Sequence, residues 1–151
     1  KRFIGKAVTR SCDRLLINEG VSNVENLGYY NGKFGPLNEM SIPMNDRVHW
    51  FGDGVYDAGP ARNYKIFAID EHIDRFFNSA ELLEIEMPCT KQELKNLLNK
   101  LVKKVDTGSQ FVYYQVTRGT GIRDHAFTEG PGNLWVMLKP PPSPMASSLL
   151  S

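Results

Sequence analysis

DEHIDRFFNSAELLEIEMPCTKQELKNLLNKLVKKV, residues 70–105, is the part of the chain with helical periodicity. We expect Asp70 to cap the N-terminus of a first helix, because a side-chain oxygen there can accept from an otherwise unpaired backbone amide. Apolar residues then recur every three or four positions, as on one helix face. These residues are Ile73, Phe76, Phe77, Ala80 and Leu83. The spacing predicts an amphipathic helix with one buried stripe.

A second helix is predicted to begin after Thr90. Thr90 and Glu93 have the spacing of a capping box, in which each side chain satisfies a backbone amide of the other residue. Gly108 is expected to end this helix. Its predicted buried face consists of Leu94, Leu97, Leu98, Leu101, Val102 and Val105.

Strand patterns lie on both sides of these helices. Asn31-Gly32 separates two aromatic-rich runs and predicts a hairpin, since both central residues of a type I′ turn need positive φ. Residues 55–69 are predicted as two strands, the first ending near Pro60 and the second running from Lys65 to Ile69. SQFVYYQVTRG (109–119) and NLWVMLK (133–139) are typical of buried strands.

The order of strands, two helices and further strands predicts an α+β fold, with both helices on one face of a largely antiparallel sheet. A chain of 151 residues fits one domain, which we place at residues 27–140. Residues 1–26 are expected to be an extension. Residues 141–151 are rich in proline and in small and polar residues, and we expect them to begin an interdomain linker. Residues 41–54 are expected to be a loop.

Composition restricts the function. The net charge of +1 argues against nucleic-acid binding by bulk electrostatics and against a polybasic membrane surface. No apolar run approaches the ~20 residues that span a bilayer. We therefore expect a cytoplasmic protein that binds neither nucleic acid nor membrane.

Arg123 and His125 stand two positions apart in RGTGIRDHAF, residues 118–127. In an extended segment their side chains would point to the same side, with Asp124 turned away. An arginine fork and a nearby imidazole can together bind a carboxylate. The alternative is a solvated loop, in which Arg123 has no lasting partner and Asp124 hydrogen-bonds its own turn. On spacing alone, the solvated loop is favoured.

The segment FGDGVYDAG, residues 51–59, raises the question of a phosphate-binding loop. Such loops lead into a helix, whereas Gly52 and Gly54 lead into a predicted strand, so a tight turn is the preferred interpretation. Tyr56 and Asp57 should face opposite sides of that strand. The Tyr56 hydroxyl is a candidate hydrogen-bond donor to a ligand.

Arg75 lies beside the apolar stripe of the first predicted helix, four residues after Glu71. Composition favours a surface ion pair between them, contributing a few tenths of a kcal/mol, roughly 0.2–0.5. His72 and Asp74 stand two apart on the same helix and cannot face one metal ion. We predict no metal site.

Three segments occur together in one order: FGDGVYDAG, then EHIDRFFNSAELLEI (71–85), then YYQVTRGTGIRDHAF (113–127). In this combination the chain resembles the N-terminal half of the class IV pyridoxal-phosphate aminotransferases of fold type IV. The Arg-x-His after TRGT most resembles the D-amino-acid (D-alanine) aminotransferases among them. The similarity covers residues 27–140 without a large gap.

The resemblance implies the small domain of that fold, pyridoxal 5′-phosphate as cofactor, and amino acids and 2-oxo acids as substrates. Arg75 would bind the cofactor phosphate, and Tyr56 would hydrogen-bond the substrate carboxylate. Arg123 and His125 would complete this carboxylate trap, reaching into the neighbouring subunit's site of a homodimer. Asp57 replaces the glutamate that is more usual in the family.

The resemblance also implies a missing part. The family's Schiff-base lysine lies in a C-terminal domain, and none of the ten lysines here occupies a matching motif. The chain alone is therefore expected to be inactive. Alternatives within the fold are a branched-chain L-amino-acid aminotransferase and an aminodeoxychorismate lyase, and outside it a non-catalytic module.

Overall fold

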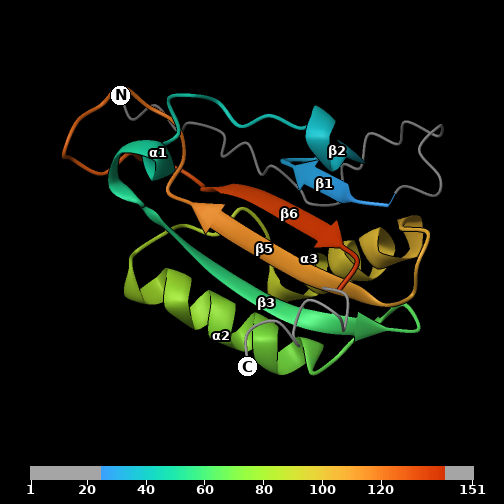
Figure 1. Cartoon of the computed structure of the whole chain (residues 1–151). Coiled ribbons are helices and arrows are strands. Elements are labelled where there is room, and N and C mark those ends of the chain that lie inside the picture. Colours follow the sequence, from blue (N-terminus) through green and yellow to red (C-terminus); the bar gives the residue numbers. More distant parts are fainter. Residues whose placement is uncertain (1–24, 142–151) are drawn as a thin grey trace, which may run out of the picture.

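The computed structural model describes residues 25–141, which form one sheet with helices against it (Figure 1). The strands are β1 (Leu27–Tyr30), β2 (Lys33–Pro36), β3 (Gly54–Arg62), β4 (Lys65–Ile66), β5 (Gln110–Thr117) and β6 (Asn133–Lys139). The helices are α1 (Arg47–Phe51), α2 (Ile69–Leu82) and α3 (Lys91–Leu101), with short 3₁₀ turns at Leu37–Glu39 and Val102–Lys104. Apart from residues 25, 26 and 141, the predicted extension and linker lie outside the described residues.

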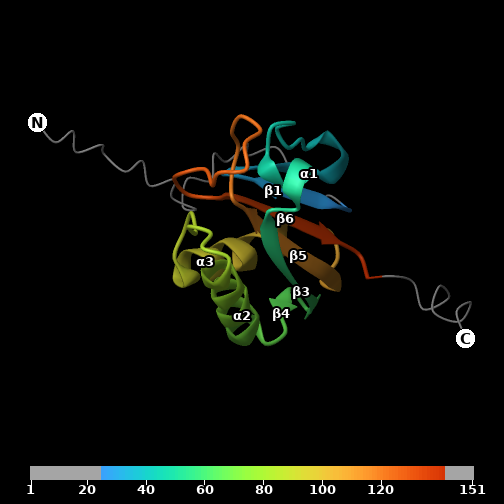
Figure 2. The same ribbon diagram turned by 90° about the vertical axis from the view of Figure 1, so that its left-hand side faces the viewer.

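The six strands are ordered β2-β1-β6-β5-β3-β4, and each pair of neighbours is antiparallel. Figure 2 shows α2 and α3 together on one side of this sheet. The prediction of an α+β fold with two helices on one face is confirmed. The strand order differs from the sequence order because the last strand, β6, lies between β1 and β5 and so joins the N-terminal hairpin to the rest of the sheet.

The core lies between the helices and the sheet face that they cover. Alternate residues of β5 and β6 point into it, as the two-residue period of a strand requires. Fully burying a leucine-sized side chain contributes ~1.5–3 kcal/mol relative to exposure, so this layer is the main source of stability. Its buried side chains include Val112, Tyr114, Val116, Leu134, Val136, Leu138, Ile73, Phe76, Ala80, Leu94, Leu97, Leu98 and Leu101.

Local signals placed the hairpin and α3 correctly. Asn31 and Gly32 have φ of 43° and 95°, the left-handed values that the hairpin turn requires. Thr90 and Glu93 form the predicted capping box, in which the Thr90 backbone N–H donates to Glu93 Oε2 at 2.7 Å. The helix ends at Leu101 and continues as a 3₁₀ turn, so its end lies earlier than the expected stop at Gly108.

The predicted start of α2 was wrong. Ala68, at a φ of 46°, is the N-cap residue, and Asp70 lies inside the first turn. The Asp70 carboxylate accepts from Lys95 Nζ at 2.6 Å instead of capping the helix. Leu83 follows the last helical residue and is 46% exposed, so it does not belong to the buried stripe. Phe77 of the predicted stripe is only partly buried.

A short helix replaces part of the predicted loop at residues 41–54. Asp46 caps α1 by accepting a hydrogen bond from the Val48 backbone N–H at 3.0 Å. Gly52, at a φ of 61°, ends the helix, and Gly54 begins β3. Five residues are too few to show a helical period, which explains why the pattern missed it. The interpretation of Gly52 and Gly54 as a turn leading into a strand is confirmed.

The second predicted strand pair also needs correction. β3 runs past Pro60 to Arg62, and β4 contains only Lys65 and Ile66. Pro60 is tolerated because its carbonyl accepts from the Phe67 backbone N–H at 3.0 Å on the outer edge, so its nitrogen faces that edge too. Pairing with β4 covers only Ala61 and Arg62 of β3. Among residues 25–141, no strand pairs with the outer edge of β3 before Ala61.

Candidate functional site

Arg75, on α2, belongs to a polar cluster with Asp57 of β3 and His72. Asp57 is 3% exposed and faces the helices. Arg75 Nε donates to Asp57 Oδ2 at 2.7 Å and Arg75 Nη2 donates to Oδ1 at 2.9 Å. His72 Nδ1 lies 2.8 Å from the same Oδ1 and donates to it in the tautomer that carries the proton on Nδ1. Gly59 permits this approach, because a Cβ there would lie 2.8 Å from His72 Nε2.

The cluster fixes an ionised carboxylate against one side of the guanidinium. Burial works to raise the pKa of Asp57, but the hydrogen bonds from Arg75 and then from His72 bring that pKa below its ordinary value. The hydrogen bond to Asp57 raises the pKa of Arg75. The Arg75 side chain is 64% exposed, and no group within residues 25–141 accepts from its Nη1. One end of the fork therefore faces solvent.

The favoured ion pair between Glu71 and Arg75 was wrong. The partner of Arg75 is Asp57, eighteen positions earlier in the chain. Asp57 points from β3 toward α2 and offers two carboxylate oxygens to the two nitrogens of the fork, a bidentate geometry. An exposed Glu71 one helical turn away offers only a screened contact.

Tyr56 faces the opposite side of β3, as predicted from the strand period. Its side chain is on the sheet face away from α2 and α3 and is 66% exposed. The Tyr56 ring stacks on Tyr113 of β5, with centroids 5.2 Å apart and an interplanar angle of 20°. Tyr113 in turn contacts Trp135 of β6 at 5.2 Å between centroids. An aromatic row thus crosses three neighbouring strands.

Tyr56 and Arg75 lie on opposite sides of the sheet. Arg75 bonds to Asp57 on the side of the helices, whereas Tyr56 stacks on Tyr113 on the other side. Among the described residues, neither of the two side chains contacts the other.

The segment with Arg123 and His125 is a bent loop rather than the extended segment assumed above. Both side chains are exposed, and both lie beside the ring of Phe51 in α1. Arg123 Cζ is 5.3 Å from the ring centroid, and the His125 ring centroid is 5.6 Å from it. Asp124 Oδ1 accepts from the Ala126 backbone N–H at 3.4 Å, which is the local bond that the solvated-loop interpretation expected.

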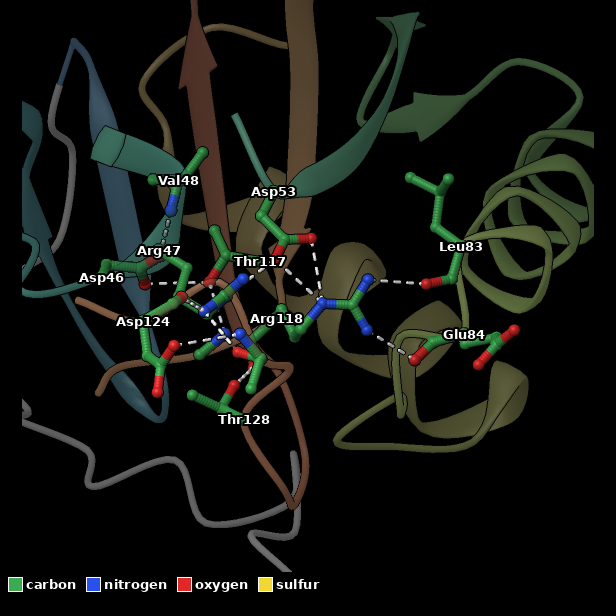
Figure 3. A network of polar contacts seen from close by, with 12 residues as sticks. Asp46, Arg47, Val48, Asp53, Leu83, Glu84, Thr117, Arg118, Asp124 and Thr128 are labelled. Atoms are coloured by element: carbon green, nitrogen blue, oxygen red, sulfur yellow. Dashed lines mark hydrogen bonds and ion pairs between the residues drawn. The ribbon is translucent and has the colours of Figure 1, made fainter. Parts of the chain in front are cut away.

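A buried network that sequence reasoning missed holds this loop to the domain (Figure 3). Asp53 accepts from Arg47 Nε at 2.8 Å and from Arg118 Nε at 2.9 and 3.0 Å. Arg118 also donates to the backbone carbonyls of Leu83 and Glu84 at 2.7 and 2.8 Å. Burial works to raise the pKa of Asp53, but the hydrogen bonds from Arg118 and then from Arg47 lower it below its ordinary value.

The sequence signal for this network is weak. Asp53 stands between two glycines, and Arg118 directly follows the buried end of β5. The partners are 65 positions apart, so only the fold brings them together. A second buried carboxylate, Asp46, accepts from Thr117 Oγ1 at 2.8 Å and Asn133 Nδ2 at 2.9 Å, which ties α1 to β5 and β6.

Lysines, possible metal ligands and helix lengths within the described residues bear on the remaining predictions. None of the eight lysines within residues 25–141 is buried, and Lys1 and Lys6 lie outside the described residues. Within the described part of the chain, no three His, Cys, Asp or Glu side chains stand close enough to hold a metal ion. No helix there is long and apolar enough to cross a membrane.

Comparison with known families gives one match that covers most of the chain. The family model described as amino-transferase class IV matches residues 54–149. This range includes Tyr56, Arg75, Arg123 and His125.

Individual relatives agree with the family match. The chain is 34% identical over 99 residues to a D-alanine aminotransferase of Staphylococcus haemolyticus, covering 66% of this chain and 35% of the relative. It is 37% identical over 101 residues to that of Staphylococcus aureus, with 66% and 35% covered. For that of Listeria monocytogenes the identity is 42% over 81 residues, with 54% and 28% covered. The chain thus spans about a third of the length of these relatives.

Solved structures confirm the fold. The branched-chain amino acid aminotransferase from Escherichia coli has a TM-score of 0.69 at 15% identity, covering 78% of this chain and 41% of that one. The branched-chain aminotransferase from Thermoproteus uzoniensis has a TM-score of 0.66 at 16% identity, with 76% and 40% covered. At these identities the likeness concerns the fold alone, and the described sheet and helices match the small domain of fold type IV.

Proposed function

The chain belongs to the class IV aminotransferase family, and we propose that the complete protein transfers an amino group between a D-amino acid and a 2-oxo acid. The placement of Arg123 and His125 on one aromatic ring carries the proposal, because it presents a fork and an imidazole together. The identity to D-alanine aminotransferases supports the D-amino-acid branch. We further propose a cytoplasmic homodimer.

Pyridoxal 5′-phosphate, the family's cofactor, would supply the amino-group carrier and electron sink. The residues present fit its phosphate group at Arg75. Asp57 and His72 occupy one side of the Arg75 guanidinium, and the Nη1 end is left for a phosphate oxygen. Because Asp57 holds the plane of the fork, Arg75 would bind the phosphate without first losing rotamer freedom.

The substrate carboxylate would be bound by Tyr56, Arg123 and His125. Within one chain Tyr56 contacts Tyr113, whereas Arg123 and His125 contact Phe51. A clamp that combines all three is therefore proposed to form across a homodimer, with the loop of one subunit reaching the site of the other. Arg47, whose guanidinium also donates to Asp53, holds the backbone of that loop.

We propose that the Schiff-base lysine lies in a C-terminal domain, which would correspond to the part of the relatives' length that this chain does not cover. The chain of 151 residues alone would then bind cofactor weakly through Arg75 and would not transfer amino groups. A non-catalytic module is the alternative, in which case the complete protein would also fail to turn over any amino acid.

The experiment is a donor panel with the complete protein, pyridoxal phosphate, and either pyruvate or 2-oxoglutarate. The proposal expects turnover of D-alanine and other D-amino acids. Turnover of L-leucine, L-isoleucine and L-valine alone would instead assign the branched-chain activity. Release of pyruvate from aminodeoxychorismate without an acceptor would assign the lyase.

A further inference from the structure

α1 presents two side chains to the loop that contains Arg123 and His125. Arg47 and Phe51 are the first and last residues of this helix, four positions apart, and so lie on one face of it. Arg47 Cζ is 4.8 Å from the centroid of the Phe51 ring, so the two side chains are in contact. Arg47 contacts the backbone of the loop, whereas Phe51 contacts its side chains.

Arg47 holds the loop backbone on both sides of His125. Its side chain is 3% exposed, and its Nη1 donates to the carbonyl of Asp124 at 2.7 Å and to that of Ala126 at 2.9 Å. Arg47 Nε donates to Asp53, which fixes the guanidinium from the domain side. The position of the His125 backbone is therefore set by α1.

Phe51 contacts the side chains. Arg123 Cζ and the His125 ring lie 5.3 and 5.6 Å from the centroid of the same ring. A guanidinium is attracted to the face of an aromatic ring, and a second ring prefers a tilted approach such as the 48° seen for His125. Phe51 is thus a shared contact for two exposed side chains in a loop without regular secondary structure.

We propose that Arg47 and Phe51 are positioning residues, which set the placement of Arg123 and His125 relative to each other and so the recognition of the α-carboxylate. This inference rests on the proposed function. Without the ring, each side chain would have to be ordered when the substrate binds, and that entropy cost would reduce the efficiency of the clamp.

The first test uses steady-state kinetics of the complete protein with D-alanine. Phe51→Leu removes the ring and keeps an apolar side chain, and we expect kcat/KM to fall on the order of tenfold. Phe51→Tyr keeps the ring and should restore most of that loss. Phe67→Leu is the matched control, because Phe67 is 71% exposed near the other end of β3 and should leave kcat/KM near wild type.

A double-mutant cycle separates positioning from general stability. If Phe51 acts through the clamp, Phe51→Leu should have almost no further effect on kcat/KM in an Arg123→Ala, His125→Ala background. Multiplication of the two losses would overturn the inference. A merely structural role of Phe51 would make the losses multiply, because it would lower activity whether or not the loop contains Arg123 and His125. Phe51→Met serves as a second variant if Phe51→Leu does not fold.

The cycle also distinguishes this inference from the proposed function. If Arg123→Ala and His125→Ala both retain wild-type kinetics, the carboxylate clamp itself is wrong. If they lose activity and the Phe51→Leu loss multiplies with theirs, the clamp stands and its positioning by α1 is wrong.

Discussion

Asp53→Asn removes the shared counter-charge of two buried arginines with little change of shape. The side chain of Asp53 is 11% exposed, and those of Arg47 and Arg118 are 3% and 6% exposed. Within residues 25–141, no other carboxylate forms an ion pair with either arginine. The remaining acceptors of the two guanidiniums are backbone carbonyls, which carry no net charge.

The expected loss of unfolding free energy is about 3 kcal/mol. Removing one partner of a buried ion pair costs ~3–5 kcal/mol, because the charge that remains is desolvated and uncompensated. The lower end applies here, since the asparagine oxygen still accepts one hydrogen bond and the carbonyls of Leu83, Glu84, Asp124 and Ala126 still solvate the arginines.

The difference between wild type and variant should depend on pH. The pKa of Asp53 is lower in the folded state than in the unfolded state, so the stability that its ionisation contributes is fully present above the unfolded value of about 3.9. That contribution is lost as the pH falls through the lowered folded pKa. The difference should be constant between about pH 5 and pH 8 and should shrink below about pH 4.

Urea denaturation of the 151-residue chain, followed by far-ultraviolet circular dichroism, measures this difference. Asp74→Asn is the matched control, because Asp74 is 66% exposed and its ion pair with Lys91 contributes only ~0–1 kcal/mol. Equal losses for the two variants, or a loss below about 1 kcal/mol for Asp53→Asn, would refute the reasoning.

Three further substitutions concern the proposed binding residues. Arg75→Ala should raise the dissociation constant of pyridoxal phosphate on the order of tenfold, because a fixed fork is lost, while the circular dichroism spectrum is unchanged. Arg62→Ala, an exposed change at the end of β3, is the control, and equal affinities for both variants would contradict the phosphate role. Arg123→Ala should lower kcat/KM for D-alanine by a factor that corresponds to a loss of ~2–5 kcal/mol of transition-state stabilisation. His125→Ala should cost less, because a neutral imidazole has one donor, and wild-type kinetics for both would restore the solvated-loop interpretation.

The parts of the fold predicted correctly depend on short-range signals. Asn31-Gly32 specifies its turn by backbone conformation alone, and Thr90 and Glu93 are three positions apart in one helical turn. The buried face of α3 follows from the period of its leucines. In each case the residues that determine the structure are neighbours in the sequence.

The parts that were missed depend on contacts across the fold. Asp70 was expected to cap a helix because nothing in the sequence indicates that Lys95, 25 positions away, takes its carboxylate. Arg75 was assigned the neighbour Glu71 because Asp57 becomes its partner only when α2 packs on β3. The spacing of Arg123 and His125 alone favoured a solvated loop, and only the family resemblance implied a carboxylate clamp. Their shared contact with Phe51 depends on a helix too short to leave a pattern.

The most direct test of the proposed D-amino-acid transfer is the configuration of the alanine that the complete protein forms from pyruvate. The protein, pyridoxal phosphate and a racemic amino donor would be incubated, and the product resolved by chiral chromatography. We expect D-alanine as the product in wild type and a large reduction of that product in Arg123→Ala. L-alanine as the product, or D-alanine formed equally well by Arg123→Ala, would contradict it.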